Sequence, residues 1–218
     1  MQTILKVLVG SRGHGLENCD SDYDYRSCFV QNTKLILGLQ GFTKFSNKDD
    51  NTQWEVQKFL TECLKCNPNV LEVLNAPAID ITDEGYELQK LFIHIINKRG
   101  IYNAFTGFAK SQKSQALSRE VPPKRINKFL CHYLRVLYSG LELLESGVLP
   151  VNVKDRPWGR ICRDAKDGKF ELAEGLELGK QLELKLQHSL ETTKIPDNAN
   201  IMAVEQYLLN VRLNHLRT

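Results

Sequence analysis

The first residues with recognisable chemistry form the sequence Gly10-Ser11-Arg12, which directly follows an apolar stretch, Thr3 to Val9. Glycine has no side chain, so backbone N–H groups at such a position can approach an anion closely. The Ser11 hydroxyl and amide can bind phosphate oxygens in the same turn. The sequence therefore predicts a phosphate-binding turn at residues 10 to 12.

A pair of acidic residues, Asp22 and Asp24, follows ten residues later. On a strand, residues i and i+2 project from the same face with Cα atoms about 6.5 to 7 Å apart. Carboxylate oxygens are the ligands that Mg²⁺ prefers. Two such ions about 4 Å apart can activate a hydroxyl and neutralise a leaving pyrophosphate. The pair predicts a Mg²⁺ site, in which Mn²⁺ can substitute.

Two arginines lie near these acids in the sequence. Arg12 follows the phosphate-binding serine and is our candidate for contacting a triphosphate. Arg26 falls on the Asp22 and Asp24 face of the expected strand, where it would orient the carboxylates by bidentate pairing. Tyr23 lies between the two aspartates, so alternation along a strand predicts that it faces the core.

The elements that position these residues are a set of short strands and two helices. The pattern predicts strands over residues 3 to 9, 23 to 30 and 51 to 56. The last strand runs into a helix that ends before Asn67-Pro68, since the residue before proline disfavours helix. A short helix over residues 70 to 74 follows, and residues 31 to 49 are turn-rich and receive no assignment.

From Asp83 onward the apolar residues recur at helical spacing. Pro122-Pro123 opens a long helix, and two more helices are predicted over residues 171 to 191 and 201 to 216. We therefore predict an α+β protein. Its catalytic core, a minimal mixed β-sheet with helices, spans residues 1 to 80, and a C-terminal helical domain spans residues 81 to 218.

The order and spacing of these motifs resemble the polymerase-β-like nucleotidyltransferase superfamily. Within it, the chain is similar to the predicted nucleotidyltransferases associated with RNA-repair pathways, over roughly residues 4 to 150. The residues that carry this narrower resemblance are Gly10-Ser11-Arg12, Gly15, Ser21-Asp22, Asp24, Arg26, Asn67-Pro68-Asn69, Leu71-Glu72-Val73-Leu74, Lys128, His132 and Arg135.

The resemblance implies a third carboxylate, from a neighbouring strand, which completes the metal site and helps to deprotonate the attacking hydroxyl. The family places an acid before an aromatic residue, an apolar residue and a Lys-Phe-Leu helix. Asp50, Trp54 and Val56 match that arrangement, and we favour Asp50. Glu55, between two apolar residues of the same strand, is the alternative. For either residue, the interpretation without a metal is that the side chain is simply an exposed acid.

The positive charge of the chain is concentrated in one stretch. Between residues 110 and 135, seven Lys and Arg residues face a single acid, Glu120, which suits a polyanion as well as a solvated basic face. Lys128, His132 and Arg135 fall on one helical face and are candidates for binding nucleotide phosphates. The alternative is that this face only covers a domain interface.

The resemblance implies an enzyme that moves a nucleoside monophosphate from an NTP to a hydroxyl acceptor and releases pyrophosphate. An RNA or tRNA end is the acceptor that the basic stretch favours. A protein or small-molecule acceptor, or a non-catalytic RNA-binding module, are the alternatives. The Gly-Ser turn argues against a glycosyltransferase, whose Asp-x-Asp motif binds a nucleotide diphosphate.

The composition sets the outer limits of these interpretations. The 218 residues are 42% hydrophobic and 25% charged, which is average for a globular protein. No apolar run approaches the roughly 18 residues of a membrane span. We therefore expect a cytoplasmic protein without a membrane partner. The six cysteines are too few and too irregular for a disulfide scaffold, so we expect reduced thiols.

Overall fold

The structure is a computed structural model that describes residues 1–39, 45–48 and 51–217, without the side chains of residues 45–48, 51, 123, 124 and 217. The chain packs into two compact units. The sheet unit comprises residues 1–13, 19–96 and 198–218. The helical unit comprises residues 14–18 and 97–197.

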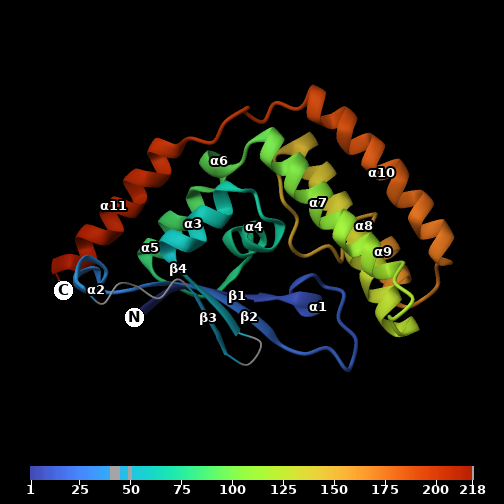
Figure 1. Ribbon diagram of the computed structural model, residues 1–218, viewed down its shortest axis with the longest axis horizontal. Helices are drawn as coiled ribbons and strands as arrows, with labels where there is room; N and C mark the ends of the chain where they lie inside the picture. The colour runs from blue at the N-terminus through green and yellow to red at the C-terminus, as the bar shows by residue number, and fades with distance from the viewer. Residues whose placement is uncertain (40–44, 49–50, 218) are drawn as a thin grey trace. The chain divides into compact units, whose positions relative to one another are not determined.

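The sheet unit is built on a mixed five-stranded sheet in the order β3-β4-β2-β1-β5 (Figure 1). Its strands are β1 (Gln2–Val9), β2 (Asp24–Val30), β3 (Phe45–Lys48), β4 (Asn51–Glu55) and β5 (Ala78–Ile81). The central strand β2 pairs antiparallel with β1 and parallel with β4. Strands β3 and β5 form the two edges, each pairing antiparallel with its neighbour.

Three of the strands were predicted and two were not. β1, β2 and β4 lie where the apolar pattern predicts strands, within one or two residues at each end. The unpredicted β5 is an edge strand of four residues, exposed over the first three. Its burial follows no two-residue alternation, so the sequence carries little signal for it. β3 has the same length and lies inside the unassigned stretch of residues 31 to 49.

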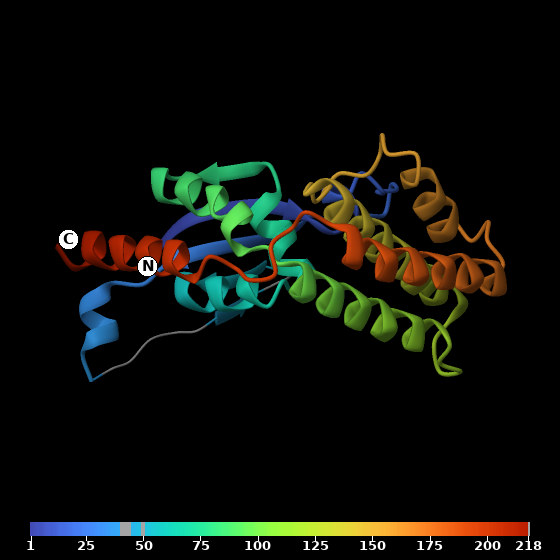
Figure 2. The same cartoon turned by 90° about the horizontal axis from the view of Figure 1, so that it is seen from above.

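Short helices of the sheet unit cover one face of the sheet and bury its apolar residues. The helices of this unit are α1 (Gly10–Gly13), α2 (Thr33–Leu37), α3 (Val56–Leu64), α4 (Pro68–Asn75), α5 (Asp83–Lys90), α6 (Phe92–Ile95) and α11 (Ile201–Arg217). Helices α4 and α5 contact β1, and α3 contacts β2. The C-terminal helix α11 packs along α3 and α5 (Figures 1 and 2).

The helical unit is a bundle centred on one long helix. Its helices are α7 (Lys98–Ala116), α8 (Pro123–Ser146), α9 (Gly159–Lys166) and α10 (Leu172–Thr192). Helices α7, α9 and α10 all pack against α8, whose buried residues include Tyr133 and Leu137. Pro123 occupies the first turn of α8, as the Pro122-Pro123 pair predicts. No helix in the described part of the chain is both long and apolar enough to cross a bilayer.

The α+β fold class and the helical C-terminal region are confirmed. The predicted division at residue 80 differs from the observed packing, because residues 81–96 and 198–218 belong to the sheet unit. Helices α5, α6 and α11 bury apolar side chains such as Leu88, Ile95 and Val211 in this unit, where α5 and α6 contact α4, and α11 contacts α3, α5 and α6. Helical periodicity shows that these segments have an apolar face but not which core that face joins.

Candidate active site

The predicted phosphate-binding turn and the second aspartate meet where β1 ends and β2 begins. β1 ends at Val9, and residues Gly10–Gly13 form a single helical turn, α1, directly after it. Because β1 and β2 are antiparallel, Val9 pairs with Asp24, the first residue of β2. The strand pairing therefore places Asp24 beside the Gly10-Ser11-Arg12 turn.

Gly10 has a specific steric reason to be glycine. Its φ of +66° lies in the left-handed region, which residues with a Cβ rarely adopt. A Cβ at this position would overlap the Asp24 Oδ2 atom. The backbone of the turn thus lies directly against the carboxylate, so these two motifs form one site.

Asp22 lies just outside the strand on which it was predicted. β2 begins at Asp24, and Asp22 is exposed in the segment before it. The prediction that Tyr23 faces the core is wrong, since its side chain is 59% exposed. Strand alternation applies only within the strand, and Tyr23 precedes it.

Arg12 binds the chain on both sides of Asp22. Its Nε atom donates a hydrogen bond to the Ser21 carbonyl at 2.9 Å. Its guanidinium lies 4.0 Å from the centroid of the Tyr23 ring, a cation–π contact. Within the described chain neither Nη group of Arg12 has a hydrogen-bond partner, so the predicted triphosphate contact remains open to them.

Both aspartates of the site keep their charge uncompensated. Neither Asp22 nor Asp24 forms an ion pair with a basic side chain of the described residues. Oxygen donors that lack a protein cation suit a hard divalent ion such as Mg²⁺. Across residues 1–39, 45–48 and 51–217, no group of three His, Cys, Asp or Glu side chains is placed to hold a metal. Asp50, the predicted third ligand, lies outside the described residues.

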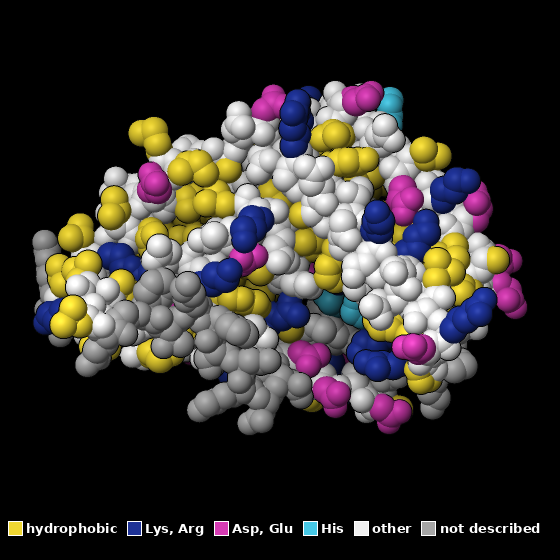
Figure 3. Space-filling view, in the orientation of Figure 1, with side chains coloured by type: hydrophobic (Ala, Val, Ile, Leu, Met, Phe, Trp, Pro, Cys, Tyr) yellow, Lys and Arg dark blue, Asp and Glu magenta, His cyan; other side chains and the backbone are white. Residues whose placement is uncertain are grey.

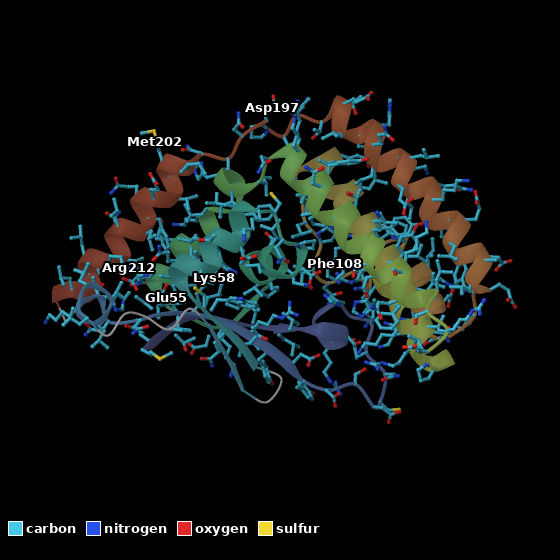
Figure 4. All side chains as sticks on the ribbon, in the orientation of Figure 1. Glu55, Lys58, Phe108, Asp197, Met202 and Arg212 are labelled. Carbon is cyan, nitrogen blue, oxygen red and sulfur yellow. The ribbon has the colours of Figure 1, made fainter. Side chains whose placement is uncertain are left out.

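Glu55, the alternative third carboxylate, has two partners in the sheet unit. Its Oε2 atom accepts a hydrogen bond of 2.8 Å from the Gln57 backbone N–H and caps α3. Its Oε1 atom lies 2.6 Å from Arg212 Nη1 of α11, a close ion pair without the alignment of a hydrogen bond (Figure 4). Glu55 is fully buried. Since its charge is already paired, we retain Asp50 as the predicted ligand.

Arg26 contacts the start of α4, and within the described residues no ion pair joins it to Asp22 or Asp24. Its Nη1 atom donates to the Asn69 carbonyl at 3.1 Å, and its guanidinium lies 6.0 Å from the Trp54 ring. The Asn67 side chain caps α4 by accepting from the Asn69 N–H at 3.1 Å, and Pro68 takes the first turn. The Asn67-Pro68-Asn69 motif therefore has a local structural explanation.

The remaining predicted nucleotide-binding residues belong to the helical unit. Lys128 is exposed on α8, His132 is half-buried, and Arg135 is 3% exposed. Burial raises the pKa of the neighbouring thiol of Cys131 to about 11, and the nearby Arg135, Lys166 and Arg163 act in the opposite direction. Burial lowers the pKa of Lys166, and the Lys128 cation acts in the same direction. These cations thus lie near one another on α8 and α9.

Two functional candidates on α9 were missed by the sequence analysis. Arg163 donates hydrogen bonds to the Gly15 and Glu17 carbonyls, and Lys166 Nζ donates to the Leu16 carbonyl at 2.6 Å. They hold three consecutive carbonyls of the segment between the Gly10-Ser11-Arg12 turn and Asp22. The basic residues of α9 are a sequence signal, but no spacing rule connects them with residues 15 to 17.

Comparison with known proteins identifies the family of this chain. The family model RlaP, described as RNA repair pathway DNA polymerase beta family, matches residues 1–208. The chain is 28% identical over 152 residues to "Uncharacterized protein MJ0002" from Methanocaldococcus jannaschii. That match covers 66% of this chain and 61% of the relative. No solved structure matches the chain. The chain belongs to the RNA repair pathway DNA polymerase beta family.

Proposed function

We propose that this protein is a Mg²⁺-dependent nucleotidyltransferase that transfers a nucleoside monophosphate from an NTP to a hydroxyl at an RNA or tRNA end. The observation that carries the proposal is the contact of the Gly10 turn with Asp24 beside a second aspartate that has no cation partner among the described residues. Membership of a family named for RNA repair and polymerase β supports it.

Each residue of the site has a role in this reaction. Gly10 and Ser11 would bind the triphosphate oxygens, and Arg12 would add a positive charge while it holds the segment around Asp22. Asp22, Asp24 and Asp50 would hold Mg²⁺, or Mn²⁺ in its place. The bound ion supplies charge neutralisation of the triphosphate and activation of the attacking hydroxyl.

The transfer itself exchanges one phosphorus–oxygen bond for another. The acceptor oxygen bonds to the α-phosphorus, the bond from that phosphorus to the β-bridging oxygen breaks, and pyrophosphate leaves. The hydroxyl proton passes to a carboxylate, for which Asp50 is our candidate. Lys128 and Arg135 are proposed to contact nucleotide phosphates.

The test is transfer of label from each of the four α-³²P-labelled NTPs, with Mg²⁺, to total RNA, a protein mixture and small-molecule acceptors. The Asp22→Asn/Asp24→Asn double variant is the control. Label on RNA that is absent from the control supports the proposal. Label on protein or on a small molecule keeps the chemistry and overturns the RNA acceptor, and no transfer to any acceptor overturns the enzyme.

A further inference from the structure

A groove of the helical unit contains none of the predicted catalytic, metal-binding or nucleotide-binding residues, and its two lysines lie in the basic stretch of residues 110 to 135. Its volume is about 700 Å³. It is lined by Tyr102, Thr106, Lys110, Lys113, Ser114, Leu117 and Glu183. Six of these seven residues come from α7 or its C-terminal cap, and Glu183 comes from α10.

The lining residues of α7 form a stripe along one side of the helix. Tyr102, Thr106, Lys110 and Lys113 are spaced by four, four and three residues, the helical interval that places side chains on the same face. From Tyr102 to Lys113 the stripe is about 16 Å long at the rise of an α-helix. That length corresponds to about five stacked nucleotides of a single strand.

The charge of α7 distinguishes it from the helix across the groove. α7 contains four Lys and Arg residues and no acid. α10 contains four Glu against two Lys. In Figure 3, basic side chains (dark blue) lie next to an acidic one (magenta) between these two helices. The α7 side of the groove is therefore complementary to an anion.

Two of the groove residues have fixed partners. Lys113 Nζ lies 3.7 Å from Glu183 Oε1 and 5.6 Å from the centroid of the Tyr133 ring. The Tyr133 hydroxyl donates to the same Glu183 oxygen at 2.7 Å. Lys110, by contrast, is exposed and forms no ion pair within the described chain. Lys110 can therefore bind a phosphate without first breaking an ion pair, whereas Lys113 would have to leave Glu183.

The groove also offers apolar surface for flat groups. Leu117 is 54% exposed, and the Tyr102 ring is half-buried. Aromatic side chains beside a basic groove bind single-stranded nucleic acid, because bases stack on the rings while lysines follow the backbone. A chain of acidic side chains, such as poly-glutamate, would pair with the lysines but has no flat ring to stack on Tyr102.

We propose that the α7 groove binds a single strand of RNA, with a base against Tyr102 and a phosphate at Lys110. This inference rests on the proposed function, since it gives the RNA acceptor a binding surface on the helical unit. Tyr102 and Lys110 act here as binding residues and take no part in the chemistry at Asp22 and Asp24.

The experiment measures the Kd of the full chain for a fluorescein-labelled 12-nucleotide single-stranded RNA by anisotropy, in EDTA and without NTP. We expect Tyr102→Ala to weaken binding about tenfold, the loss typical of one stacked base. Tyr102→Phe, which keeps the ring, should bind as the unaltered chain does. Lys110→Gln should lower the slope of log Kd against log salt by about 0.7, the value for one phosphate contact on a single strand.

Lys180→Gln is the matched control, because Lys180 is exposed on α10 and does not line the groove. Unchanged RNA binding in both Tyr102→Ala and Lys110→Gln overturns the groove proposal. So does an absence of RNA binding, or equal binding of a labelled poly-glutamate peptide. RNA binding that depends on Tyr102 in a chain that transfers no label supports the groove and overturns only the proposed enzyme.

Discussion

Two sets of carboxylates on the same sheet differ in how their charge is compensated. Glu55 at the end of β4 is fully buried and lies 2.6 Å from Arg212. Asp24, the first residue of β2, is half-buried, and Asp22 is exposed in the segment just before it. Neither is paired with a basic group of the described chain. We call Glu55 with Arg212 the closed pair, because the fold supplies the basic partner. We call Asp22 and Asp24 the open carboxylates, because no basic side chain of the described residues pairs with them.

The difference shows what burial demands of an acid. A buried carboxylate without a partner costs several kcal/mol, so Glu55 persists only because Arg212 and the α3 backbone compensate it. Asp22 is exposed and Asp24 is half-buried, so neither needs such a partner. Open carboxylates beside the predicted phosphate-binding turn can bind a cation, whereas a closed ion pair contributes to stability.

The largest expected effect is on activity at the open carboxylates. Asp22→Asn or Asp24→Asn should each reduce nucleotidyl transfer by about a hundredfold or more, because metal-bound charge stabilisation is worth several kcal/mol. Stability should change by less than about 1 kcal/mol, because removing a half-exposed or exposed charge breaks no ion pair. Label transfer and urea denaturation measure the two quantities.

The matched control for these variants is Asp80→Asn, on the exposed edge strand β5. It removes an exposed carboxylate of the same sheet that we assign no role. Activity in Asp80→Asn should equal that of the unaltered chain. Near-normal transfer by both Asp22→Asn and Asp24→Asn would falsify the proposed metal site.

The second effect is on stability at the closed pair. Arg212→Met should lower the free energy of unfolding by about 3 kcal/mol, because it leaves the buried Glu55 charge unpaired. Adding Glu55→Gln to that variant should restore part of the loss, because the orphaned charge is then removed. Urea denaturation of the single and double variants gives the coupling energy, and a coupling near zero would contradict a buried ion pair.

The third effect tests the contact between the turn and the open carboxylate. Gly10→Ala introduces a Cβ into the Asp24 carboxylate at a positive φ. We expect a loss of about 2 kcal/mol in stability together with reduced transfer. Gly107→Ala on α7 is the control, since a Cβ there meets no atom within 4 Å and alanine favours helix. Equal behaviour of the two variants would show that Gly10 has no special role.

The smallest effect is the pH dependence of stability that comes from Cys28, a buried thiol near the closed pair. Burial, and then the neighbouring Cys63 and Glu55, raise the pKa of Cys28 well above its ordinary value of 9.0, while Arg212 acts in the opposite direction. The folded state therefore keeps this proton at a pH where the unfolded chain has lost it. The contribution of this proton to the free energy of unfolding is fully present below about pH 9. Above that pH the free energy of unfolding should fall by up to about 1.4 kcal/mol per pH unit.

Urea denaturation between pH 8 and pH 10 measures this slope. Cys28→Ala should reduce the slope of the free energy of unfolding against pH by the contribution of one titrating proton. Cys19→Ala, which removes an exposed thiol, should leave it unchanged. An identical slope in both variants would mean that Cys28 does not contribute to the alkaline loss of stability.

Local patterns predicted the elements around the site well. Apolar runs located β1, β2 and β4, and Pro122-Pro123 located the start of α8. The edge strand β5 was not predicted because an exposed strand of four residues has no apolar alternation. Tyr23 was misplaced because alternation was extended one residue beyond the strand, where the Arg12 contact decides its position.

The sequence by itself determined the family, and its motifs, a Gly-Ser turn after a strand and two aspartates at the next strand, predicted the chemistry. These signals are local, so they survive without knowledge of the tertiary structure. Only the tertiary structure decided that Glu55 is paired with Arg212, that Arg163 and Lys166 hold residues 15 to 17, and that α11 joins the sheet unit. Each of these joins residues more than 140 positions apart or a segment to a distant core, and no spacing in the sequence encodes such contacts.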